Sequence, residues 1–361
     1  MRWITRVLIV LCALLIAVPS QSAAGVSAST SACPAGGCSV YLPLTRTAGK
    51  LLTVGLVTDV NGINDKSFNQ SAWQGVLNAQ ANLGASGAYL ESESEYDYAT
   101  NINQFISQGT ELIITVGYLL SDVTKAAAQG NPDQKFSIVD VAYDPIIPNI
   151  LSQTYASEQA AFLSAYLAAG MTTTGIVATF GGMNIPTVTR FMNGYHQGVS
   201  YYNQEHGASI QVLGWDPDTQ TGEFTNDFND PAAGKAMGEK LLGLGADILF
   251  PVAGPTGLGA AQAVQEQGDA WVIGVDTDLT LTAPEYASIV LTSALKNPRV
   301  TTYEAIKLAY QDRFVGGELL GTLANEGVGL GTIAASVPPE LLTKVEQVKA
   351  AIIAGEIIVI P

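Results

Sequence analysis

The chain has 361 residues, which is enough for two domains, because single cores rarely grow beyond about 250–300 residues. Its hydrophobic fraction of 47% and its 37 glycines indicate an ordered globular protein. Only 13% of the residues are charged and the net charge is −16, so no basic patch is available to neutralise phosphates, and nucleic acid is not an expected partner.

The first 24 residues have the pattern of a cleaved signal peptide. Arg2 and Arg6 flank the start of the apolar run VLIVLCALLIAV, which Pro19 closes. This run is too short for a membrane-spanning helix, which needs about 20 apolar residues. Small residues follow, so we expect cleavage after Ala24 and export of the mature chain. Residues 25–49 are rich in Ser, Thr, Ala and Gly and are predicted to form a flexible tether.

Three cysteines occur, and two of them are expected in the mature chain. Cys12 lies inside the expected signal peptide, whereas Cys33 and Cys38 lie in SACPAGGCS. A small disulfide loop between the last two is allowed in an exported protein. Alternatively, Cys33 follows small residues and is the attachment site of a lipid anchor, although it trails the apolar run by some distance. The sequence leaves both alternatives open.

From residue 51 onward, short apolar runs alternate with helix-length amphipathic segments. Continuously apolar strands separated by helices predict a parallel sheet covered on both faces. In the first series, strands are expected at 51–59, 86–92, 111–117 and 136–141, and helices at 69–84, 98–108 and 121–130.

A second series of similar length follows a strand and long helix at 149–170. Strands are expected at 174–182, 209–215, 246–254, 271–278 and 288–296, and helices at 186–205, 231–244, 256–268 and 298–313. The fold class is therefore α/β, with two doubly wound parallel-sheet lobes joined by a hinge. The late strands indicate that the chain crosses between the lobes more than once. We predict lobe 1 at 50–155 plus about 290–330 and lobe 2 at 156–289 plus about 331–361.

Ligands of such sheets bind beyond the carboxyl ends of the strands. The positions to examine are therefore 59–69, 117–122, 140–144, 181–184, 254–259, 276–278 and 293–297.

Catalytic and metal-binding interpretations of the stretch TDVNGINDKSFNQ are unfavourable. An EF-hand beginning at Asp59 requires an oxygen ligand, Gly and Glu where Ile63, Asn64 and Gln70 stand. A calcium-dependent nucleoside hydrolase requires two further carboxylates where Asn61 and Lys66 stand. The chain also has only two histidines and no G-x-S-x-G elbow. We therefore expect a binding protein without catalysis, cofactor or metal.

Aromatic and charged residues at the strand ends fit a planar, hydroxyl-bearing ligand instead. Phe68 follows the first strand, and either Phe224 or Phe228 could supply a second stacking ring from the other lobe. Asp59, Asp276 and Lys296 could bind hydroxyls through charge-assisted hydrogen bonds. With one lysine and no arginine among these candidates, a neutral ligand is favoured over a phosphate.

The glycine-rich strand-to-helix turn VAGPTGLGAAQ lacks the third glycine of a dinucleotide fingerprint. Gly254, Gly257 and Gly259 could still let backbone amides at a helix N-terminus approach a ligand closely. A tight turn between strand and helix explains the same glycines equally well.

Several segments together resemble the basic membrane protein family, the substrate-binding components of ABC transporters that include purine nucleoside receptor A-like lipoproteins. These segments are VGLVTDVNGINDKSFNQSAWQG, GGMNIPTVTRFMNGYHQGV, GADILFPVAGPTGLGAAQAV, IGVDTD and LTSALKN. The resemblance runs in order from about residue 51 to the closing GEIIVIP. It implies a type I periplasmic-binding fold that closes on a purine nucleoside, an ABC permease as membrane partner, and a monomer.

The resemblance also implies roles for individual residues. Phe68 would stack on the base and Asn69 would read the purine edge, while Asp59 would accept a hydrogen bond from the ligand. Asp276 and Lys296 would hold the ribose hydroxyls. Gly254 would lie at the same wall, and Phe228 fits the second stacking position better than Phe224. Asn61, Gly62 and Asn64 would shape the turn that presents these groups. There are two alternative functions. The same two-lobed fold could bind a sugar or another small metabolite, or the chain could be a nucleoside hydrolase.

Overall fold

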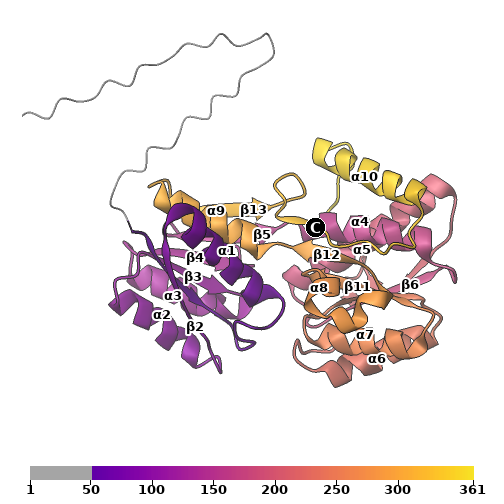
Figure 1. Ribbon diagram of the computed structural model, residues 1–361, viewed down its shortest axis with the longest axis horizontal. Helices are drawn as coiled ribbons and strands as arrows, with labels where there is room; N and C mark the ends of the chain where they lie inside the picture. Colours follow the sequence, from indigo (N-terminus) through magenta and orange to yellow (C-terminus); the bar gives the residue numbers. More distant parts are fainter. Residues whose placement is uncertain (1–50) are drawn as a thin grey trace, which may run out of the picture. The chain divides into compact units, whose positions relative to one another are not determined.

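The computed structural model describes residues 51–361 (Figure 1). The expected signal peptide at 1–24 and the tether at 25–49, with Cys33 and Cys38, lie outside the described residues. The residues described belong to one compact unit, Gly49–Pro361, which holds two six-stranded sheets. No helix within this part of the chain is long and apolar enough to cross a membrane.

The first sheet is entirely parallel, with strand order β13-β5-β4-β3-β1-β2. All five residues of β3 are buried, as expected for a strand covered on both faces. The strands are β1 (Thr53–Val57), β2 (Ser86–Leu90), β3 (Leu112–Val116), β4 (Lys135–Val139), β5 (Ile150–Tyr155) and β13 (Gly317–Gly321).

The second sheet has the order β14-β12-β11-β10-β6-β7 and is parallel except for β14, which runs antiparallel to β12. The strands are β6 (Ile176–Gly181), β7 (Gln211–Leu213), β10 (Ile248–Val252), β11 (Trp271–Asp276), β12 (Val290–Lys296) and β14 (Val328–Leu330). A separate hairpin pairs β8 (Trp215–Asp216) with β9 (Thr221–Gly222).

Helices cover the faces of both sheets, so the predicted doubly wound α/β architecture is confirmed (Figure 1). Helix α1 packs against α9, α4 against α5, and α6 against α7. The helices are α1 (Phe68–Leu83), α2 (Asp97–Ser107), α3 (Ser121–Gly130), α4 (Ser157–Met171), α5 (Pro186–His206), α6 (Pro231–Gly243), α7 (Thr256–Gln267), α8 (Leu279–Thr282), α9 (Pro298–Tyr310) and α10 (Pro339–Ala354), with 3₁₀ turns η1 (Tyr118–Leu120) and η2 (Pro284–Ile289).

Local sequence explains where two helices near the site begin and end. Helix α1 stops at Gly84, whose φ of 73° is a left-handed conformation that glycine adopts without a steric penalty. Helix α5 begins at Pro186, a residue suited to the first helical turn, and ends at Gly207 with a φ of 63°.

The chain passes between the sheets three times: after β5, after β12, and between β13 and β14. Strand β12 pairs with β11 in the second sheet, so the passage expected near residue 290 falls after Lys296 instead. The return to the second sheet falls between Gly321 and Val328, slightly before the expected 330. Nearly all residues of β12 are buried. A strand buried on both faces fits either sheet, so its sequence alone did not show which sheet it joins.

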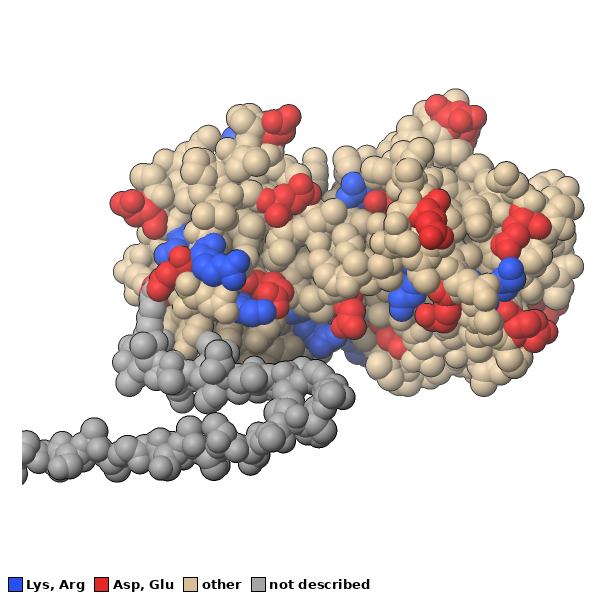
Figure 2. Space-filling model, turned by 90° about the horizontal axis from the view of Figure 1, so that it is seen from above, with Lys and Arg blue, Asp and Glu red and all other residues tan. Residues whose placement is uncertain are grey.

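Charged side chains on the face shown in Figure 2 form small groups in which acidic and basic residues are interspersed. That face shows no extended basic field of the kind that follows a nucleic-acid backbone.

Candidate functional site: a cavity between the two sheets

A cavity of about 270 Å³ lies where the carboxyl ends of strands from both sheets meet. Its lining includes residues just after β1, β4 and β6 and the last residues of β11 and β12, as expected for a ligand site of parallel sheets. Six of the seven residues predicted from the sequence line this one cavity: Asp59, Phe68, Phe228, Gly254, Asp276 and Lys296.

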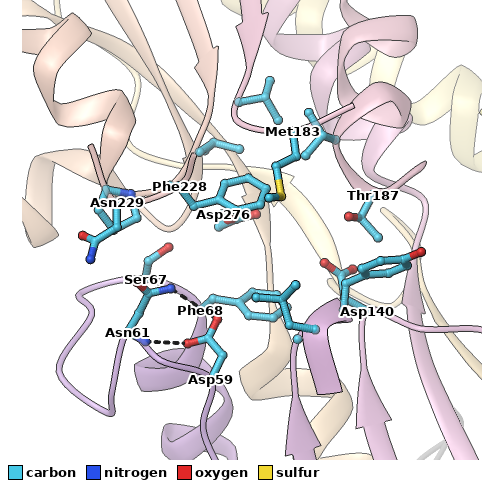
Figure 3. A pocket seen from close by; sticks show the side chains of 18 of the residues that line it. Asp59, Asn61, Ser67, Phe68, Asp140, Met183, Thr187, Phe228, Asn229 and Asp276 are labelled. Carbon is cyan, nitrogen blue, oxygen red and sulfur yellow. Dashed lines mark hydrogen bonds between the residues drawn. The ribbon is translucent and has the colours of Figure 1, made fainter. Parts of the chain in front are cut away.

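Two phenyl rings enter the cavity from different lobes. Phe68 stands at the first position of α1, beside the first sheet, and Phe228 lies in the loop before α6, beside the second. Figure 3 shows the two rings on opposite sides of the same space. Such an arrangement offers a flat ligand a ring on each face.

Phe228 and Phe224 each pack against one of two consecutive glycines, the last residue of β6 and the residue after it. A Cβ on Gly182 would lie 2.4 Å from Phe228 Cδ1, and a Cβ on Gly181 would lie 2.5 Å from Phe224 Cε1. Both rings therefore pack on backbone that has no side chain. Only Phe228 lines the cavity, whereas the ring of Phe224 packs edge-on against Trp215, with centroids 6.1 Å apart.

Lys296 forms an ion pair between the two lobes. Its Nζ lies 2.8 Å from Asp140 Oδ2, which follows β4 of the first sheet, and 3.7 Å from Asp276 Oδ1 of the second. The lysine is only 3% exposed. Burial lowers the pKa of Lys296, but the two carboxylates more than offset that effect, so the pKa is raised and the ammonium stays charged.

Asp276 presents an oxygen that no described protein group satisfies. Its Oδ1 is buried and accepts no hydrogen bond, and its backbone has a φ of 64°, a left-handed conformation uncommon outside glycine. Burial raises the pKa of Asp276 to about 6, with further increases from Asp140 and Asp65 and an opposing effect of Lys296. An unsatisfied carboxylate oxygen beside a ligand cavity can accept a hydrogen bond from a hydroxyl group.

Asn69 does not line the cavity and is fully buried. Its Nδ2 donates to Asp59 Oδ1 at 2.7 Å, and its Oδ1 accepts from the Asp59 backbone at 3.4 Å. The placement that the resemblance implied, beside Phe68 and against the ligand, therefore differs from the one observed. Asn69 holds Asp59 in position from behind.

Asp59 lies in the cavity lining near the ring of Phe68 (Figure 3). It accepts from the Asn61 backbone at 2.9 Å and from Asn61 Nδ2 at 3.2 Å. Gly62 follows with a φ of 69°, so the predicted turn function of Asn61 and Gly62 agrees with this geometry. Burial raises the pKa of Asp59, while hydrogen bonds from Asn69 and Asn61 act against it.

Sequence reasoning missed several residues of the cavity. Asp140 lies in the strand-end segment 140–144, yet nothing in the sequence distinguishes it from an ordinary turn residue. Asp65 caps α1 by accepting from the backbone of Ser67 and Asn69. Other lining residues not predicted include Met183, Phe191 and Asn229.

The glycines of the strand-to-helix turn have separate functions. Gly254, with a φ of 53°, lines the cavity, whereas Gly257 does not. A Cβ on Gly259 would lie 1.8 Å from the Pro231 carbonyl oxygen, so this glycine permits α7 to pack closely on α6. Only the first of the three supports the expected close approach to a ligand.

The fold and this cavity define a solute-binding protein of the type I periplasmic-binding class. A solved ABC transporter solute-binding protein from Aeropyrum pernix K1 has a TM-score of 0.72 and 28% identity, covering 85% of this chain and 92% of that one. A solute-binding protein from Conexibacter woesei has the same fold, with a TM-score of 0.68 at 23% identity, covering 86% of this chain and 98% of that one.

The family model for the ABC transporter substrate-binding protein PnrA-like family matches residues 52–360. The nucleoside-binding protein BmpA of Lactococcus lactis subsp. cremoris is 34% identical over 335 residues, which is 87% of this chain and 91% of the relative. Basic membrane protein A of Borreliella burgdorferi is 32% identical and covers 85% of this chain and 87% of its own length. The chain belongs to this PnrA-like, basic membrane protein family of ABC transporter substrate-binding proteins.

The pKa of Asp276 predicts a specific pH dependence of stability. Because the folded pKa of about 6 exceeds the ordinary value of 3.8, the folded state binds this proton more readily than the unfolded state between those values. The charged carboxyl therefore costs stability increasingly as the pH rises from about 4 to about 6, and the cost stays constant above that.

Replacing Asp276 by Asn should remove this dependence. Urea unfolding of both proteins between about pH 4 and about pH 7 measures the difference in unfolding free energy. We expect that difference to shift in favour of the Asn variant as the pH rises to about 6 and then to level off. A difference that does not change with pH would contradict the raised pKa.

Proposed function

We propose that this chain is the extracytoplasmic component of an ABC importer, a monomer that captures a purine nucleoside and delivers it to a membrane permease. The observation that carries the proposal is the pair of phenyl rings, Phe68 and Phe228, on opposite sides of one cavity that also contains Asp276 and Lys296. Stacking on two faces suits a heteroaromatic base, and each base–aromatic contact contributes about 1–3 kcal/mol.

The polar groups of the cavity favour the sugar of a nucleoside over a phosphate. The ammonium of Lys296 is already paired with Asp140, so it brings no uncompensated positive charge to an anionic ligand. Asp276 Oδ1 is free to accept from a ribose hydroxyl, and Lys296 can donate to a neighbouring one. A neutral polyol attached to a base uses all of these groups.

Closure between the lobes explains how a ligand could be enclosed. Three chain passages connect the lobes. Contacts between the lobes include the Asp140–Lys296 pair and a hydrogen bond from Thr277 Oγ1 to the Lys66 carbonyl, 3.2 Å long. Hinged lobes of this kind close around ligands and open to release them. The permease would receive the ligand on opening.

Isothermal titration with inosine, guanosine and adenosine tests the proposal. We expect at least one of the three to bind at a single site, and no free base to form during incubation. Mass spectrometry of ligand carried through purification should identify a nucleoside. A sugar in its place, no heat with any of the three, or release of free base would each reject the proposed function.

A further inference from the structure

The charged groups that line the cavity are strongly unbalanced. Five carboxylates and one ammonium contribute to the lining: Asp59, Asp65, Asp140, Asp227, Asp276 and Lys296. The single ammonium already pairs with Asp140 at 2.8 Å and lies 3.7 Å from Asp276. Within residues 51–361, the remaining lining carboxylates form no such pair.

Asp59 and Asp65 lie together in the cavity lining. Asn69 Nδ2 bridges them, 2.7 Å from Asp59 Oδ1 and 3.2 Å from Asp65 Oδ2. Their other partners are amides, and within residues 51–361 neither forms an ion pair. Burial raises the pKa of both carboxyls, and Asp59 further raises that of Asp65. Amide dipoles therefore leave their negative charges only partly compensated.

Among the described residues, no group of three or more His, Cys, Asp or Glu side chains is placed to hold a metal ion. The compensating charge can come from the ligand, because the space beside these carboxylates opens between the two rings (Figure 3).

The rings themselves favour a positive charge. The face of a phenyl ring carries negative electrostatic potential, so a cation between two rings is attracted from both sides. Met183 lies at the same cavity, with its polarisable sulfur directed toward the ring of Phe228 (Figure 3). A neutral base gains stacking here, whereas a cationic base gains stacking and charge compensation.

We propose that the cleft prefers purine nucleosides whose base carries a permanent positive charge, such as N7-methylated guanosine, over neutral nucleosides of the same shape. The proposal rests on the proposed nucleoside function of this cavity. The sugar would keep its contacts with Asp276 and Lys296, and the cationic base would lie between Phe68 and Phe228 beside Asp59.

Titration calorimetry with two ligands of matched shape tests the preference. 7-Methylguanosine carries the positive charge while its N1 stays protonated, so the titrations are run at mildly acidic pH. 7-Deaza-7-methylguanosine has the methyl group at the same place without the charge. We expect the cation to bind about 3- to 30-fold more tightly, the range of a cation between aromatic faces that is partly or fully desolvated. Guanosine itself serves as the reference for nucleoside binding.

Removing one carboxylate from the cavity tests whether the preference for the cationic ligand arises there. Asp59→Asn removes one carboxylate next to the base and should reduce the ratio between the two affinities toward one. Asp133→Asn removes one negative charge at an exposed position outside the cavity lining and should leave the ratio unchanged. The ratio is informative even if Asp59→Asn weakens both ligands, because both are measured on the same variant.

Equal affinities, or tighter binding of the neutral ligand, would overturn this inference while leaving the proposed function intact if guanosine binds. A ratio that Asp133→Asn reduces as much as Asp59→Asn would also overturn it, because the effect would then reflect net charge. If neither guanosine nor its analogues bind, the proposed function itself fails.

Discussion

Replacing Lys296 by Met is expected to destabilise the protein by about 3–5 kcal/mol, the usual result of removing one partner from a buried ion pair. The lysine is 3% exposed, and the substitution would leave Asp140 and Asp276, whose side chains are 13% and 16% exposed, without their only nearby ammonium. Methionine keeps most of the apolar stem, so the loss should come from the carboxylates. Urea unfolding monitored by circular dichroism measures it.

An exposed lysine provides the matched control. Lys307 pairs with Glu304 at 2.8 Å one helical turn away, with side chains 36% and 40% exposed. Lys307→Met should change the unfolding free energy by about 0.5 kcal/mol or less, because solvent screens such a pair. Adding Asp140→Asn to Lys296→Met should recover part of the lost stability. If Lys296→Met lowered the unfolding free energy as little as Lys307→Met, the buried ion pair would not stabilise the protein as expected.

Removing either stacking ring is expected to reduce nucleoside affinity by about 5- to 150-fold, which corresponds to about 1–3 kcal/mol for each base–aromatic contact. Phe68→Ala removes the ring of one lobe and Phe228→Ala that of the other. Both rings line the cavity and are only partly buried in the free protein. Loss of affinity should therefore exceed any loss of folding stability. Calorimetric titration of each variant with guanosine measures the effect.

Phe224 supplies a control of the same residue type four positions away. Its ring packs on Gly181 and edge-on against Trp215, outside the cavity lining. Phe224→Ala should lower the unfolding free energy, because it leaves a void beside Trp215, and should leave the affinity nearly unchanged. The opposite pattern, with Phe224→Ala weakening binding and Phe228→Ala not doing so, would show that the wrong ring has been assigned.

Much of this architecture could be predicted from the order of apolar and amphipathic segments. Ile248–Val252 is apolar at every position, Leu112–Val116 is apolar except for Thr115, and all residues of both strands are buried. This pattern requires helices on both faces of a parallel sheet. Because parallel strands end at one edge, Asp59, Asp276 and Lys296 could be expected to converge although they are far apart in the sequence.

Other features depended on contacts that a single sequence does not contain. Val290–Lys296 is apolar enough for either sheet, so only its pairing with β11 placed it in the second lobe. Asn69 follows Phe68 directly, yet the helix turns its amide toward Asp59 instead of the cavity. Phe224 and Phe228 could be distinguished only by their surroundings, because Phe228 lines the cavity whereas Phe224 packs against Trp215.

Asp140 is the clearest example of a site residue whose role could not be predicted from the sequence. It follows a strand, as several ordinary turn residues do, and its importance arises from a lysine 156 residues later in the chain, 2.8 Å away in space. Residue type and strand-end position could identify it as a candidate, but only the meeting of the two lobes makes it the partner of Lys296.

A crystal structure of this protein with guanosine bound would test the central claim most directly. We expect the purine to lie between the rings of Phe68 and Phe228, with the ribose hydroxyls in hydrogen-bond range of Asp276 and Lys296. A nucleoside bound elsewhere, or one that contacts a ring from only one lobe, would contradict the account.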